Sequence, residues 1–169
     1  MQNMIQFELD KDKAINAVLY IINRLGPVKY HKLSKILYFA EQEHLKLYGR
    51  PITGDQYVAM EYGPVPSYAY DVFKYELSDK LSIQNKTVSA LVDPDLEELS
   101  VSEINAIEHS IVNNQNLGFQ ALVDKSHDLA WENSRKLHPQ LLDFIDIALA
   151  GGADEKMINY IQSSNEKLI

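Results

Sequence analysis

The sequence predicts a mainly α fold: a compact, single-domain helical bundle with a small β-hairpin. Three observations favour this fold class. Several stretches repeat apolar residues at every third or fourth position, the period of an amphipathic helix. Residues that cap helices, or Gly-Pro pairs that end them, border these stretches. The chain has 169 residues, the length of one ordinary domain, and no linker divides it. We therefore expect one domain over residues 1–169.

The first half of the chain predicts three helices. Asp10 is the expected N-cap of the first, and Gly26 with Pro27 ends it. The second is the clearest, and its expected inward face carries Leu33, Ile36, Leu37, Ala40, His44 and Leu47. The opposite face carries Lys29, Lys32 and Lys35 and is expected to be solvated. Residues 57–60 should form a strand or packed loop and residues 63–66 a rigid turn, since proline fixes its own φ. The third helix should follow, with Ala69, Val72, Phe73 and Leu77 inward.

The second half predicts a hairpin and four more helices. Residues 87–92 alternate like a strand, with residues 96–99 as the expected returning strand. Ser100 and Glu103 form a capping box for a helix with Ile104, Ile107, Ile111 and Val112 inward. A short helix should span about 118–125. The next should begin at Pro139, with Leu142, Ile145 and Leu149 inward, and Asp154 should cap the last.

Charge and composition narrow the classes of function. The formal net charge is -8, and it is uneven: residues 1–50 hold 8 Lys and Arg against 5 Asp and Glu, whereas residues 51–169 hold 8 against 19. An acidic protein repels phosphates, so direct nucleic-acid binding is disfavoured. There is no cysteine, which excludes disulfides and thiolate chemistry. We see no signal peptide and no apolar run long enough to span a membrane, so we expect a cytoplasmic protein without a membrane partner.

No catalytic, cofactor-binding or metal-binding set is evident. Phosphate-binding glycine loops and nucleophile elbows are absent from the sequence. One alternative is a di-iron bundle, because Glu41 and His44, and again Asp124 and His127, stand one helical turn apart, with Glu76 and Glu108 as further carboxylates. We favour a structural role, because His44 falls on the apolar face of the second helix.

Tyrosines point to a binding surface. Six of the ten lie between residues 48 and 75: Tyr48, Tyr57, Tyr62, Tyr68, Tyr70 and Tyr75. Tyrosine is enriched in protein interfaces, although these rings could instead cover the core. Together with the basic face of the second helix, they predict a partner-binding patch of Lys32, Lys35, Tyr62, Tyr68, Tyr70 and Tyr75.

Ordered motifs in the sequence resemble a known family. Residues 32–40 (KLSKILYFA), 49–52 (GRPI) and 59–66 (AMEYGPVP), followed by Ser126-His127 and Ala130-Trp131, resemble the Panacea domain. This SocA-like antitoxin domain also occurs in phage-associated GepA-like proteins. The resemblance runs from about residue 10 to residue 135, and the helices expected over 139–169 lie outside it.

The resemblance implies an antitoxin of a toxin–antitoxin system, which neutralises a cognate protein toxin by direct binding and needs no enzymatic activity or cofactor. One alternative is an adaptor that delivers the toxin to a cellular AAA+ protease. Others are a DNA-binding regulator and the di-iron enzyme. The motif residues are interpreted as scaffold: Leu33, Leu37, Tyr38, Gly63, Pro64, Val65, Ser126, His127 and Trp131. We expect Trp131 to anchor the C-terminal part onto the second helix, Ser126 to act as a cap and His127 to hydrogen-bond nearby.

Overall fold

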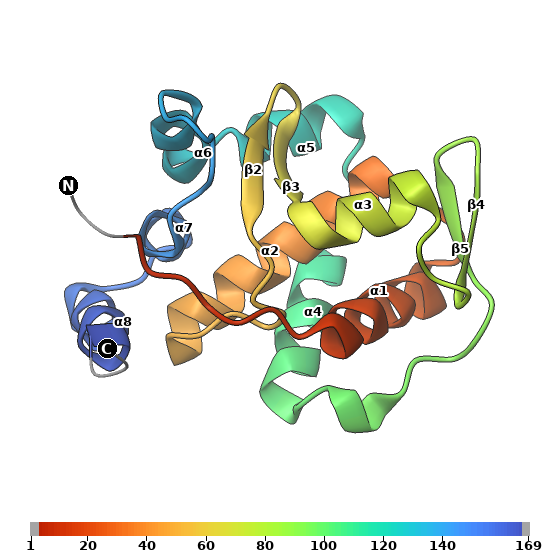
Figure 1. Cartoon of the computed structure of the whole chain (residues 1–169), viewed down its shortest axis with the longest axis horizontal. Helices are drawn as coiled ribbons and strands as arrows, with labels where there is room; N and C mark the ends of the chain where they lie inside the picture. The colour runs from red at the N-terminus through yellow and green to blue at the C-terminus, as the bar shows by residue number, and fades with distance from the viewer. Residues whose placement is uncertain (1–3, 167–169) are drawn as a thin grey trace.

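Helix α2 (Tyr30–Tyr48) runs through the middle of the fold, and the other elements surround it (Figure 1). The computed structural model describes residues 4–166, and within them eight α-helices form, so the mainly α class is confirmed. The other helices are α1 (Lys11–Leu25), α3 (Ser67–Tyr75), α4 (Val101–Asn114), α5 (Phe119–Ser126), α6 (Leu129–Arg135), α7 (Phe144–Ala150) and α8 (Glu155–Glu166). No helix in this range has the length and apolar content of a membrane span.

The predicted helix starts are confirmed at three caps. The Asp10 carboxylate accepts a hydrogen bond from the Lys13 amide at the start of α1. Ser100 and Glu103 form the expected capping box of α4. The Asp154 carboxylate accepts from the amide of Met157 in α8. In each case the side chain satisfies a backbone donor that the first turn leaves free.

A β-hairpin packs against α2. Strands β2 (Tyr57–Met60) and β3 (Gly63–Pro66) pair antiparallel, with Tyr57 opposite Pro66. The expected turn at 63–66 is therefore wrong, because this segment is a strand. Proline has no amide hydrogen to donate to a neighbouring strand. Among the residues described, β3 pairs with β2 on one side only, and such an edge strand tolerates proline.

A second sheet has the order β1–β5–β4. Its strands are β1 (Val28–Lys29), β4 (Leu81–Gln84) and β5 (Thr87–Ala90). The predicted strand over 87–92 is confirmed at 87–90. Its hairpin partner is β4, which precedes it in the sequence, and not residues 96–99. Asn85 and Lys86 make a two-residue turn with φ values of 50° and 64°, which suits a tight hairpin. Residues 96–98 form the 3-10 helix η1 (Leu96–Glu98) instead of a returning strand.

Other expectations fail where the chain has competing contacts. The helix expected at Pro139 begins at Phe144, because residues 140–142 pair with the outer edge of β2: the Ala59 amide donates to Gln140 and the Leu142 amide to Tyr57. Four leucines and valines expected inward are exposed: Leu47, Leu77, Val112 and Leu149. They stand at or near helix ends, where no neighbouring element covers them.

The core consists of two apolar clusters that share α2. One joins α2 to α1, α3, α4 and the three-stranded sheet, with Leu19, Ile36 and Ile107 at its centre. The other joins α2 to β2, α5, α6 and α7 and contains Tyr38 and Phe144. Because both clusters use α2, little of this helix faces solvent.

Candidate partner-binding groove

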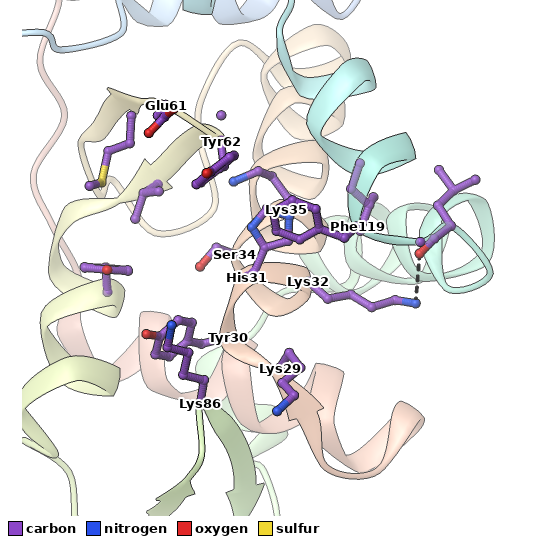
Figure 2. Close-up of a pocket in the computed structure, with 17 residues that line it drawn as sticks. Lys29, Tyr30, His31, Lys32, Ser34, Lys35, Glu61, Tyr62, Lys86 and Phe119 are labelled. Atoms are coloured by element: carbon purple, nitrogen blue, oxygen red, sulfur yellow. Dashed lines mark hydrogen bonds between the residues drawn. The ribbon is translucent and has the colours of Figure 1, made fainter.

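A groove of about 800 Å³ crosses the N-terminal half of α2 (Figure 2). Its walls are α2, the β2–β3 hairpin and the start of α5, with Tyr70 of α3 and Lys86 of the β4–β5 turn at one end. We call it the α2 groove. Its size is typical of ligand and side-chain pockets in proteins.

Two buried residues of α2 form the floor of the groove. Ser34 is 2% exposed and Lys35 is 1% exposed, so the expected solvated position of Lys35 is wrong. The hairpin covers it: the Lys35 ammonium donates to the Pro64 carbonyl oxygen at 3.0 Å. Gly63 allows this close approach, since a Cβ there would lie 2.7 Å from Lys35 Cε.

The floor is polar and incompletely hydrogen-bonded. Burial lowers the pKa of Lys35 to about 8, which leaves the side chain largely cationic at neutral pH. Burial, with a smaller contribution from the Lys35 charge, lowers the pKa of His31 to about 4, so this imidazole is neutral. His31 Nε2 and Ser34 Oγ are both buried and have no hydrogen-bond partner in the part of the chain described. Such atoms are uncommon in folded proteins; the third among the described residues is the Tyr57 hydroxyl, in the second core cluster.

The rim of the groove is apolar and exposed. Met60 is 41% exposed, Tyr62 54% and Phe119 52%. The Tyr62 and Phe119 rings meet edge to face at 5.5 Å between centroids, and the His31 ring lies 4.2 Å from Phe119. Large exposed apolar side chains gathered around a concavity are typical of a protein-binding site.

Lysines surround the first turn of α2. Lys29 donates to the Asn85 carbonyl at 2.8 Å, and Lys32 donates to the carbonyls of Gln115 and Leu117. Figure 2 shows the Lys32 side chain pointing away from Ser34, on the opposite side of α2 from Lys86. The cationic groups therefore spread along the groove and do not meet at one point.

The structure brings together four of the six predicted partner-binding residues: Lys32, Lys35, Tyr62 and Tyr70 line the groove. Tyr68 instead packs, half-buried, against the core, and Tyr75 is 61% exposed at the end of α3, outside the groove. The prediction missed Phe119. Its signal was an apolar residue at the first position of a short helix, where burial is not expected.

The motif residues hold the hairpin wall in place. The Trp131 indole donates to the Met60 carbonyl at 2.7 Å, and His127 Nε2 donates to the Glu61 carbonyl at 3.0 Å. The two rings stack at 3.7 Å. These hydrogen bonds join α6 and the segment just before it to the hairpin, while the Trp131 ring packs against the core cluster that includes Tyr38 and Phe39 of α2.

The hydrogen-bonded link to α2 is made by a different residue. The Asp128 carboxylate accepts from the Tyr38 hydroxyl at 2.7 Å and also caps α6 through the Trp131 amide. Ser126 therefore does not cap α6; its hydroxyl donates back to Val123. Leu33 and Leu37 are core residues, as expected.

The residues considered for a di-iron site have other partners. The buried Glu41 carboxylate accepts from the amides of Ile52 and Thr53, which fixes the loop after α2. His44 Nδ1 donates to the Arg50 carbonyl, and its Nε2 faces the Ser102 hydroxyl. Within residues 4–166, no three His, Asp or Glu side chains are placed to hold a metal ion.

Comparison with models of protein families supports the resemblance that the sequence motifs indicate. No curated protein and no solved structure matches this chain. The family model described as antitoxin SocA-like, Panacea domain, matches residues 33–132. This range covers more than half of the sequence and includes Ser34, Lys35, the hairpin and α5. The chain therefore belongs to the SocA-like antitoxin family of Panacea domains.

Proposed function

We propose that this protein is the antitoxin of a toxin–antitoxin pair, and that it neutralises its toxin by direct contact at the α2 groove, without catalysing a reaction. The family assignment supports an antitoxin-like role. The observation that carries the proposal to the groove is its exposed rim of Met60, Tyr62 and Phe119 above a buried polar floor. In this proposal both proteins act in the cytoplasm.

The groove suits a protein partner for an energetic reason. Apolar area removed from water contributes about 25 cal/mol per Å², and aromatic side chains in central pockets dominate the affinity of many interfaces. Tyr62 and Phe119 already contact each other, so they lose little side-chain entropy when a partner covers them. The aromatic rim is therefore preorganised for binding a partner.

The test uses a toxin-like protein encoded beside this gene, which the proposal requires. Co-expression should restore growth, and the two proteins should purify as a complex. The double variant Tyr62→Ala and Phe119→Ala should bind at least about 30-fold more weakly, because two hot-spot rings are removed. Tyr160→Ala is the matched control: Tyr160 is 55% exposed, close to the value for Tyr62, but lies on α8.

A second measurement separates binding from delivery to a protease. If contact alone neutralises the toxin, its cellular half-life should be unchanged or longer in the presence of this protein. A shorter toxin half-life that depends on a AAA+ protease would replace the proposal with the adaptor function. A complex unaffected by loss of both rim rings would place the interface elsewhere.

A further inference from the structure

The lysines of the α2 groove lack acidic partners. Among residues 4–166, three Lys or Arg side chains are ion-paired: Lys13 and Arg50 with Glu103, and Arg24 with Glu108. Lys29, Lys32, Lys35 and Lys86 are among the cations that have no carboxylate within ion-pair distance, and they lie together on one groove. Four lysines and one carboxylate, Glu61, line the groove, so it carries a local positive charge in a protein of net charge -8.

The start of α2 strengthens this positive surface. A helix N-terminus carries partial positive charge, and acidic residues are favoured in its first turn. Helix α2 has no acidic residue there and no side-chain cap, and its N-cap residue is Lys29. The helix dipole and the lysines therefore act in the same direction, and an external anionic group would relieve their mutual repulsion.

Two buried polar atoms of the groove are available for further hydrogen bonds. Ser34 Oγ and His31 Nε2 line the groove without partners in the described residues. Figure 2 shows the Ser34 hydroxyl directed toward the space between α2 and the hairpin. The amides and carbonyls of a polypeptide would satisfy such atoms.

We infer that the groove binds an acidic segment of the partner protein, with carboxylates facing Lys29, Lys32 and Lys86 and a large apolar side chain against Tyr62 and Phe119. The spread of the cations on both sides of α2 favours a segment with several charges along its length over one compact anion. The overall negative charge of this protein disfavours nucleic acid as the occupant. This inference rests on the proposed function, because the partner is the toxin.

Charge reversal tests the inference. Lys29 and Lys86 are both exposed, so the double variant Lys29→Glu and Lys86→Glu should fold normally by circular dichroism. We expect its affinity for the co-purified toxin to fall roughly 10- to 100-fold at about 0.1 M salt. Lys80→Glu with Lys156→Glu is the matched control, since both residues are exposed, lie off the groove and change the net charge equally. The control should stay within about threefold of the wild type.

Two further readouts define the partner segment. Added salt should weaken wild-type binding more than binding by the groove variant, because the variant has lost the attractive charges. Hydrogen exchange on the toxin should show protection of a segment with net negative charge. Protection of a neutral or basic segment would overturn the inference. So would self-association of the wild type that the groove variant abolishes, because the occupant would then be a second copy of this chain.

The outcomes separate the two claims. If the wild type binds no neighbouring toxin, the proposed function fails. If the wild type binds and the groove variant binds as tightly as the control, the proposed function stands and the acidic segment is refuted.

Discussion

Replacing Lys35 with methionine should make the free protein more stable. Burial lowers the pKa of this lysine from 10.5 to about 8. At 1.36 kcal/mol per pH unit, keeping the charge in the folded state costs ~3 kcal/mol near pH 7. Methionine has a similar length and no charge. It loses the hydrogen bond to the Pro64 carbonyl, which costs ~1 kcal/mol, so Lys35→Met should gain ~2 kcal/mol near pH 7.

The pH dependence gives the sharper test. Between about pH 8 and 10.5 the unfolded chain binds the Lys35 proton more tightly than the folded chain does. Wild-type stability should therefore rise relative to the variant across this window. The advantage of Lys35→Met should disappear by about pH 10.5. Urea unfolding followed by the fluorescence of Trp131, the single tryptophan, would measure both values. A variant less stable than the wild type near pH 7, or a difference that does not change with pH, would refute this reasoning.

Four other substitutions test the groove, its support and a buried ion pair elsewhere in the fold. Trp131→Phe removes the hydrogen bond to Met60; it should cost about 1–2 kcal/mol of stability and speed hydrogen exchange in the hairpin. Glu103→Gln should cost ~3 kcal/mol in urea unfolding, because it breaks a buried ion-paired site. Burial disfavours the charged form of Glu103, but its hydrogen bonds from Ser100 and Lys13 outweigh that effect and keep the pKa of Glu103 below the usual value. This stabilisation should therefore be lost as the pH falls through that pKa. Tyr75→Ala should leave toxin affinity unchanged by calorimetry, whereas Tyr62→Ala should weaken it; the opposite result would move the interface to α3.

Local signals in the sequence predicted seven of the eight helices in the described residues and missed α6. Caps such as Asp10 and the Ser100–Glu103 box act within a few residues, so their outcome depends little on the rest of the fold. The missed hairpin also had a local signal. Asn85 tolerates the left-handed conformation of a tight turn, but the adjacent Lys86 has no such preference. The sequence pattern therefore indicated a partner strand at 96–99, after residues 87–92, whereas the true partner β4 precedes them.

The groove could be predicted only in part, because distant segments build it. Tyrosine content indicated Tyr62 and Tyr70, and both line it. The burial of Lys35 was not predictable from helical periodicity, since a lysine opposite an apolar face normally meets water. Only the folding of Gly63 and Pro64 back over α2 buries it. Phe119 comes from a third segment, and nothing in its own sequence context indicates the contact with Tyr62.

Three residues that weaken the isolated fold lie together in the α2 groove. Lys35 is buried without a carboxylate, and Ser34 and His31 keep polar atoms without partners in the structure described. Elsewhere, the buried Glu103 is ion-paired and the buried Glu41 accepts backbone hydrogen bonds, although the buried Tyr57 hydroxyl also has no partner among residues 4–166. Packing alone does not account for the polar floor of the groove, because an apolar floor would make a more stable protein. A bound acidic segment would supply hydrogen-bonding groups for Ser34 and His31 and bring negative charge near the buried Lys35, so part of the energy lost in the free protein would be recovered on binding. The substitution that most stabilises the free chain, Lys35→Met, should for this reason also weaken the complex.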